Sequence, residues 1–426
     1  MPHYDANNGV IKKCRNKFYN FLRWTEKWTK TDMVYLTKSS FWLLAFEVIS
    51  LLGLFLTTVF FANFLPKEEY GIYKYLISLA GILTAFSLSG MNTAVTKSVA
   101  NGYQGSLKQS FLAQIKWNII ITFISLAAAL YYLLYKNDPA IFWGLIIIGI
   151  ASPILNSANT FLAYLNGIKD FKRMFQLNTS INLASSLFTI IGMVVFPNAI
   201  FLVLIYFLIN TIANFLCYVL VIKKYKPNNL VEPTTINYGR HLSVINFLGI
   251  IALNFDKVIS FNFLGPAQLA VYNFAIALPE QLRGVIKIVP AISLPKMATS
   301  ESIGINKIFF KKIAKLTLAS LILITIYILL APFIYRLFFP QYLDSVLLSQ
   351  IFVISLIFTI PSMPLVSYLQ AKEKTKLLYK YNISSAVIQI AGIIILGYFW
   401  GLMGIIVSRI ISSIVNLVYI SYLIKK

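Results

Sequence analysis

The chain consists mostly of apolar runs long enough to cross a lipid bilayer. A helix needs about 20 apolar residues to do so, because each residue adds about 1.5 Å. Helices also satisfy their own backbone hydrogen bonds inside the bilayer. The sequence therefore predicts an all-α polytopic membrane protein with twelve transmembrane helices, at about 40–63, 70–92, 113–135, 139–164, 176–196, 199–222, 243–264, 268–292, 313–335, 346–369, 377–399 and 401–424.

The composition supports this interpretation. Hydrophobic residues make up 58% of the chain and charged residues 12%, whereas soluble domains carry about 25% charged residues. The net charge of +23 would suggest nucleic acid in a soluble protein. Here the basic residues fall between apolar runs, so we expect no nucleic-acid partner. Phosphate-binding, dinucleotide and zinc motifs are not found, and we expect neither an enzyme nor a bound metal or organic cofactor.

The basic residues alternate between the two sides of the predicted membrane. Thirty of the 37 Lys and Arg residues fall in the two termini and the even-numbered connections. The opposite side has only Lys67, Lys74, Lys136 and Arg336. Because cytoplasmic loops carry an excess of Lys and Arg, we expect both termini in the cytoplasm.

A polar connector divides the predicted helices into two groups of six. We expect a basic N-terminal segment (1–39), an N-lobe (40–222), a connector (223–242) and a C-lobe (243–426). The lobes repeat weakly at an offset of 199 residues, which pairs Phe64 with Phe263, Tyr73 with Tyr272 and Lys97 with Lys296. Such a parallel pseudo-repeat predicts an axis along the membrane normal and a central cavity between the lobes. Chance similarity between two apolar hairpins is the alternative.

Three cations lie within the predicted spans and away from the span ends: Lys257, Arg283 and Arg409. A charge in a span costs at least about 2.5 kcal/mol, so its presence suggests a path for a polar substrate. Lys287 lies one turn beyond Arg283 and either extends this group or reaches the interface. The alternative is charge pairing, by Asp256 with Lys257 and by Glu280 with Arg283 at i,i+3. Arg409 has no acidic residue nearby in the sequence.

Three acids also lie within the predicted spans: Glu47, Asp256 and Glu280. Burial can raise the pKa of a carboxyl group into the working range. We therefore expect that one of them carries a coupling H⁺ or Na⁺, or else neutralises a cavity cation.

Three stretches resemble one family. They are FLPKEEYGIYKYLISLAGILTAFSLSGMNTAVTKSVA (64–100), NFDKVISFNFLGPAQLAVYNFAIAL (254–278) and FWGLMGIIVSRIISSIVN (399–416). Together they resemble the polysaccharide transporter family, the Wzx-type O-antigen flippases of the multidrug/oligosaccharidyl-lipid/polysaccharide (MOP) superfamily. One departure is Ala270-Val271, where a Gly commonly precedes the Tyr.

The resemblance implies a MATE-like fold of two six-helix lobes in the bacterial inner membrane. It implies alternating-access transfer of an undecaprenyl-diphosphate-linked oligosaccharide, as in O-antigen and lipopolysaccharide synthesis, to the outer leaflet. A polysaccharide polymerase and a chain-length regulator are the implied partners, beside membrane lipids. The span cations and Lys287 would then hold the diphosphate or the sugar hydroxyls.

Other functions stay open. A drug/cation antiporter of the same superfamily would favour an acidic cavity, whereas here three span acids match three span cations. A lipid II flippase usually has two more helices. A membrane glycosyltransferase or polymerase generally needs a large soluble domain or a long outer loop, and the predicted outer connections are short. A scaffold would not need charges in its spans.

Overall fold

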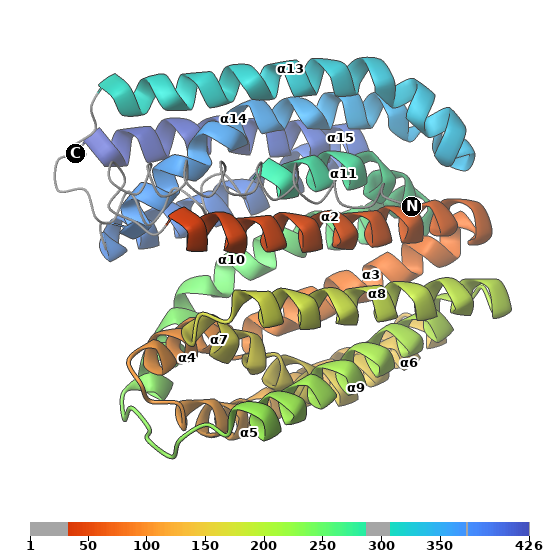
Figure 1. Cartoon of the computed structure of the whole chain (residues 1–426). Helices are drawn as coiled ribbons and strands as arrows, with labels where there is room; N and C mark the ends of the chain where they lie inside the picture. The colour runs from red at the N-terminus through yellow and green to blue at the C-terminus, as the bar shows by residue number, and fades with distance from the viewer. Residues whose placement is uncertain (1–32, 287–306, 372–373, 426) are drawn as a thin grey trace, which may run out of the picture.

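The computed structural model describes residues 33–286, 307–371 and 374–425. Within these ranges every regular element is a helix. Figure 1 shows α5 to α9 in one bundle and α11 with α13 to α15 in another, with α2, α3 and α10 lying between them. This arrangement agrees with the predicted all-α fold of two helical groups.

The N-terminal bundle is built around α6, α8 and α9. Helix α6 packs against α5 and α9, and α8 packs against α2 and α9. Asp138, Asp170 and Asn198 begin α6, α8 and α9 by accepting hydrogen bonds from first-turn backbone N–H groups, as N-cap residues do. The elements are α2 (Met33–Phe64), α3 (Lys67–Leu83), η1 (Thr84–Phe86), α4 (Met91–Ala100), α5 (Ser106–Leu134), α6 (Pro139–Ala158), α7 (Thr160–Gly167), α8 (Phe171–Val195) and α9 (Ala199–Tyr225).

The C-terminal bundle is built around α14 and α15. Helix α14 packs against α11, α13 and α15, and α15 also packs against α10. The elements are α10 (Thr235–Leu264), α11 (Pro266–Ile286), α13 (Lys307–Phe338), η2 (Pro340–Tyr342), α14 (Ser345–Ala371) and α15 (Thr375–Lys425). Pro266 follows Gly265, whose φ of 86° only glycine adopts readily. This break separates α10 from α11.

Helix α15 consists of two arms that fold back on each other at Gly401. The backbone there has φ 56° and ψ −136°, which favours glycine. Beyond the fold Gly404 lies so close to the Leu396 carbonyl that a Cβ would be 1.8 Å from its oxygen, and Gly392 faces Ser408. The two arms correspond to the predicted spans 377–399 and 401–424.

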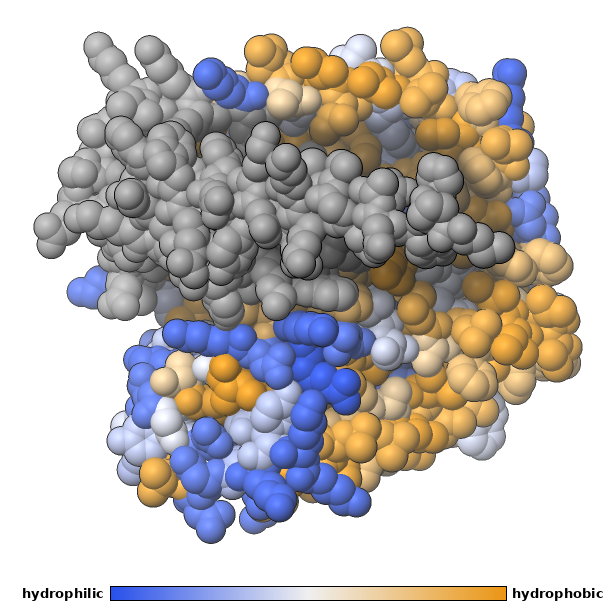
Figure 2. Space-filling model, in the orientation of Figure 1, coloured by the Kyte–Doolittle hydropathy of each residue, from blue (hydrophilic) through white to orange (hydrophobic). Residues whose placement is uncertain are grey.

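Eight helical segments of the described residues are long and apolar enough to cross a membrane, or nine if α3 and α4 count as one span. One of the eight is Lys376–Ile424, which contains both arms of α15. The observed helices are compatible with twelve spans, and that number stays a prediction. Figure 2 shows hydrophilic side chains at the end of the N-terminal bundle where α4, α7 and the beginning of α5 lie, and hydrophobic ones over the other end.

Two predicted spans differ in shape from the structure. The prediction of one helix over 70–92 is wrong, because α3 ends at Leu83 and α4 runs at 56° to it. Ser87, Ser89 and Gly90 lie at this break, and such residues disfavour a helix interior. Helix α10 begins at Thr235 rather than 243, since the polar residues before the apolar run also form a helix.

The two bundles meet along α3, α10 and α11. Helix α3 contacts α10 and α11, and α4 contacts α10. The Tyr75 ring stacks on Phe261 with centroids 3.8 Å apart. Tyr73 and Tyr272, which the repeat pairs, are both buried and stand at the same distance from the beginnings of α3 and α11. The repeated helices therefore pack against each other, whereas Lys296 lies outside the described residues.

Candidate functional site

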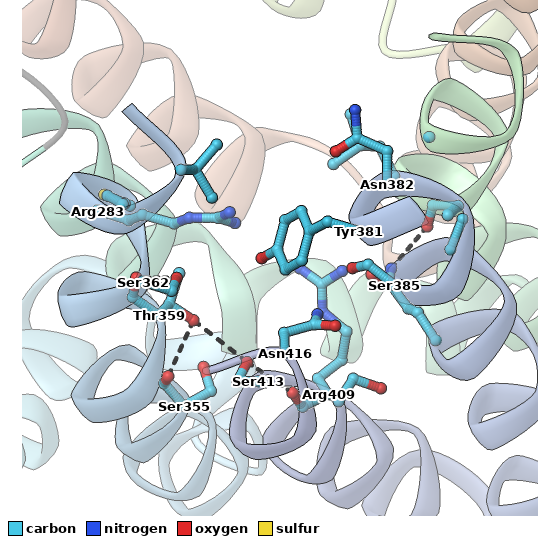
Figure 3. Close-up of a pocket in the computed structure, with 18 of the residues that line it drawn as sticks. Arg283, Ser355, Thr359, Ser362, Tyr381, Asn382, Ser385, Arg409, Ser413 and Asn416 are labelled. Atoms are coloured by element: carbon cyan, nitrogen blue, oxygen red, sulfur yellow. Dashed lines mark hydrogen bonds between the residues drawn. The ribbon is translucent and has the colours of Figure 1, made fainter. Parts of the chain in front are cut away.

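A pocket of about 870 Å³ lies among α10, α11, α14 and α15. Apolar side chains such as Ile250, Leu253 and Phe352 form part of its wall. The polar part draws on all four helices, and most of it is labelled in Figure 3: Asn246, Glu280, Arg283, Ser355, Thr359, Ser362, Ser367, Tyr381, Asn382, Ser385, Gln389, Arg409, Ser412, Ser413 and Asn416.

Two arginines share one carboxylate in this pocket. Arg409 Nη2 donates to Glu280 Oε1 at 3.2 Å, and Arg283 Nη1 donates to both Glu280 oxygens at 3.1 and 3.2 Å. This group therefore carries one net positive charge. Arg283 Nε is buried without a hydrogen-bond partner among the described residues, so the group has donor capacity left for an anion. Figure 3 shows both guanidinium groups directed into the pocket.

Arg409 lies on the second arm of α15, and contacts with α14 and α11 hold its side chain in the pocket. Its side chain is only 12% exposed, and its guanidinium lies 5.8 Å from the centre of the Phe352 ring. Ser413 donates to the Arg409 carbonyl at 2.8 Å, and Thr359 bonds Ser413 at 3.2 Å. A buried charge without a partner costs several kcal/mol, so the nearby charges of Asp256 and Glu280 explain how the fold keeps this arginine.

Arg409 has no acidic residue nearby in the sequence, but the tertiary structure gives it one. Glu280 stands 129 residues away in the chain and contacts it directly. The alternative interpretation of a local pair between Glu280 and Arg283 is confirmed, but this pair is also part of the pocket. Glu280 and Arg283 therefore pair with each other and also line the pocket.

Asp256 lies outside the lining of the pocket but close enough to Arg409 to interact with its charge. Asp256 is 1% exposed and accepts hydrogen bonds from the Tyr272 hydroxyl at 2.6 Å and the Lys257 backbone N–H at 2.9 Å. The first bond ties α10 to α11. Neither residue lines the pocket, and the pairing of the Lys257 and Asp256 side chains is not among the ion pairs of the described residues.

Two predicted site residues have no described side chain. Lys287 lies outside the described residues. Glu47 belongs to α2, and the description there covers the backbone but not this side chain. Within the described part of the chain, no three His, Cys, Asp or Glu side chains gather where they could hold a metal ion.

Sequence reasoning missed the neutral polar residues of the pocket. Asn382, Ser385 and Gln389 recur on the first arm of α15, and Gln389 Nε2 donates to the Ala252 carbonyl at 2.7 Å. Ser355, Thr359 and Ser362 recur in the same way on α14. Their spacing of three to four residues within apolar runs was the available signal, because it places them on one helical face.

A family model described as polysaccharide biosynthesis protein matches residues 36–300. No curated protein sequence matches the chain.

The fold is similar to solved structures of membrane transporters. An outward-facing multidrug resistance MATE family transporter of the MOP superfamily matches with a TM-score of 0.61 and 14% identity over 92% of this chain and 95% of the other. The lipid II flippase MurJ, in an inward closed conformation, matches with a TM-score of 0.61 and 14% identity, over 92% of this chain and 88% of MurJ. A MOP superfamily transporter from Pyrococcus furiosus matches with a TM-score of 0.56 and 14% identity, over 92% of this chain and 94% of the other. These likenesses confirm the predicted MATE-like fold.

Proposed function

Because the chain belongs to the polysaccharide biosynthesis protein family and has the fold of MOP superfamily transporters, we propose that it flips an undecaprenyl-diphosphate-linked oligosaccharide. The substrate, an O-antigen unit or similar repeat, would move from the cytoplasmic to the outer leaflet of a bacterial inner membrane by alternating access. The observation that carries the proposal is the pocket in which Arg283 and Arg409 share the single carboxylate of Glu280.

The two arginines suit a diphosphate. Guanidinium groups bind phosphate oxygens with two parallel hydrogen bonds, and both groups reach one pocket. Glu280 holds them while the pocket is empty of substrate. An arriving diphosphate carries more charge than one carboxylate, so it takes the place of Glu280 on the arginines. The return of Glu280 then assists release into the other leaflet.

The neutral polar residues suit the sugar. Hydroxyl and amide side chains from α14 and α15 offer both donors and acceptors, and the Tyr381 ring lies beside them (Figure 3). The volume of about 870 Å³ falls within the usual range of ligand pockets. It accommodates a diphosphate with part of a sugar chain, while the prenyl tail remains in the bilayer.

The other predicted roles enter this proposal as follows. Glu280 is one candidate to carry a coupling H⁺, and its protonation would release both arginines for the diphosphate. Asp256 and Glu47 are the further candidates for H⁺ or Na⁺. Lys257 and Lys287 would contact the substrate at another stage of the cycle. The polymerase and chain-length regulator are the proposed partners, and both termini would lie in the cytoplasm.

Two alternatives remain within the superfamily. The lipid II flippase function shares the diphosphate chemistry, and the fold similarity to MurJ favours it as the second candidate. A drug/cation antiporter is disfavoured by the pocket, whose charged residues Glu280, Arg283 and Arg409 sum to one positive charge.

The test is a transbilayer assay in reconstituted vesicles with a fluorescent undecaprenyl-diphosphate oligosaccharide. We expect Arg409→Ala to slow its movement at least tenfold, since a hydrogen bond to a charged group contributes about 1.5–3 kcal/mol. Arg336→Ala is the matched control, because Arg336 is exposed at the end of α13. Wild-type protein that moves only lipid II, or exports a cationic dye instead, would overturn the proposal.

A further inference from the structure

A second pocket, of about 430 Å³, lies where α5 of the N-terminal bundle meets the beginning of α10. It shares no lining residue with the first pocket. Helix α5 contributes one face, with side chains three or four residues apart from Gln109 to Ile120, and α10 contributes Ile236 and Arg240 one turn apart. It lies toward the hydrophilic end of the bundle, near the beginning of α5 (Figures 1 and 2).

Two cations and a fixed aromatic ring form the polar side of this pocket. Trp117 Nε1 donates to the Phe86 carbonyl at 3.0 Å, which holds the indole in place. The Arg240 guanidinium lies 5.6 Å from the centre of this ring, and Lys116 lies beside it in the chain. The lining contains no acid, and neither cation forms an ion pair with any described residue. The pocket therefore has positive charge available for an anion.

Apart from Gln109, the rest of the pocket is apolar, and this apolar part faces outward. Leu112 and Ile120 line it and are exposed, and Phe123 continues this exposed apolar face along α5. A tryptophan at the polar end of a span is typical of the membrane interface. Charge next to an outward apolar face matches a molecule with an anionic head and a hydrocarbon chain. A soluble anion would contact only the two cations and would leave the apolar face unused.

We propose that this pocket binds an anionic phospholipid. Lys116 and Arg240 hold the headgroup phosphate, and an acyl chain follows Ile120 and Phe123 along α5. Basic pockets between membrane helices bind such headgroups elsewhere. Because Lys116 lies on α5 and Arg240 on α10, the helix that leads into the C-terminal bundle, the bound lipid bridges the two helices and stabilises the arrangement in which they are in contact. This site is independent of the transported substrate.

The test uses the full chain, delipidated in a neutral detergent, with dioleoyl phosphatidylglycerol as the probe and native mass spectrometry as the readout. We expect phosphatidylglycerol to bind in preference to phosphatidylcholine. Lys116→Gln with Arg240→Gln should weaken its binding about thirtyfold, since each cation near an anionic lipid contributes about a fivefold factor. The control, Lys108→Gln with Lys223→Gln, removes equal charge from exposed residues outside the pocket and should leave binding within about twofold.

A second measurement leaves both cations in place. Phosphatidylglycerol with brominated acyl chains should quench tryptophan fluorescence more than brominated phosphatidylcholine, and Trp117→Phe should abolish the difference. The proposal is overturned if the control pair weakens binding as much as the pocket pair, or if the difference in quenching survives in Trp117→Phe. It is also overturned if inorganic phosphate at the same concentration displaces the lipid, because the site would then be one for free phosphate.

Discussion

Helices α3 and α11 occupy matching places in the two halves of the repeat, but α3 packs closely against a neighbouring helix where α11 lines a pocket with charged residues. At the repeat offset, Gly81 and Thr84 of the α3 region correspond to Glu280 and Arg283 of α11. Gly81 lies so close to α10 that a Cβ would be 2.6 Å from the Asn254 side chain. Glu280 and Arg283 instead face the pocket.

This difference shows how a repeat becomes asymmetric. In the N-terminal copy a small residue, Gly81, lets α3 lie close to α10, as small residues commonly do in membrane helices. The C-terminal copy places charged residues at the matching positions and keeps space around them. The pocket with the shared carboxylate thus belongs to one half only, although both halves have similar helices.

The largest expected effect is on stability, at the close contact between the two copies. A Cβ on Gly71 would lie 2.0 Å from the Pro266 carbonyl oxygen, and a backbone atom cannot move aside as a side chain can. We expect Gly71→Ala to lower the free energy of unfolding by about 3 kcal/mol, the upper end of the usual overpacking cost. Thermal unfolding in detergent measures it. An unchanged Tm would mean that α3 and α11 do not meet as the structure has them.

The second effect concerns transport. Arg283→Ala with Arg409→Ala should slow movement of the lipid-linked oligosaccharide about a hundredfold, because two charge-assisted contacts to the diphosphate are lost. Thr84→Ala in the matching α3 region is the control, since the Thr84 hydroxyl donates to the Gly81 carbonyl and Thr84 does not line the pocket. Equal transport by both variants in the vesicle assay would show that the two arginines of the pocket are not needed for transport.

The third effect concerns the shared carboxylate. Glu280→Gln keeps the shape of the side chain and removes the carboxylate charge that both arginines contact. We expect a water-soluble diphosphate sugar to bind about tenfold more tightly, as measured by calorimetry, because the anion no longer competes with the carboxylate. Transport should slow as release becomes harder. Weaker binding would instead indicate that Glu280 contacts the substrate itself.

The smallest expected effect is on stability, at a glycine of α11 that has open space around it. A Cβ on Gly284 of α11 meets nothing within 4 Å. Gly284→Ala should therefore be neutral or raise the free energy of unfolding by up to about 1 kcal/mol, the difference in helix propensity between Gly and Ala. The same thermal measurement as for Gly71→Ala tests it. A large loss would show that the space beside α11 is filled.

Much of the architecture could be read from local patterns. The apolar runs predicted nearly every helix, because a run of that length has few other stable forms in a bilayer. The break at Gly265-Pro266 and the pair of Glu280 with Arg283 were also local, since both depend on residues within one turn. The bend between α3 and α4 was missed because its few polar residues interrupt the apolar run only briefly.

The sequence by itself determined which segments are helices and which charges lie inside them. It could not distinguish Lys257 from Arg409, since both are single cations in apolar runs. Only the tertiary structure decided that Arg409 meets Glu280 across two helices while Lys257 lies away from that pocket. The physical reason is that helical periodicity assigns each residue to a face, whereas the packing of distant helices determines which faces meet.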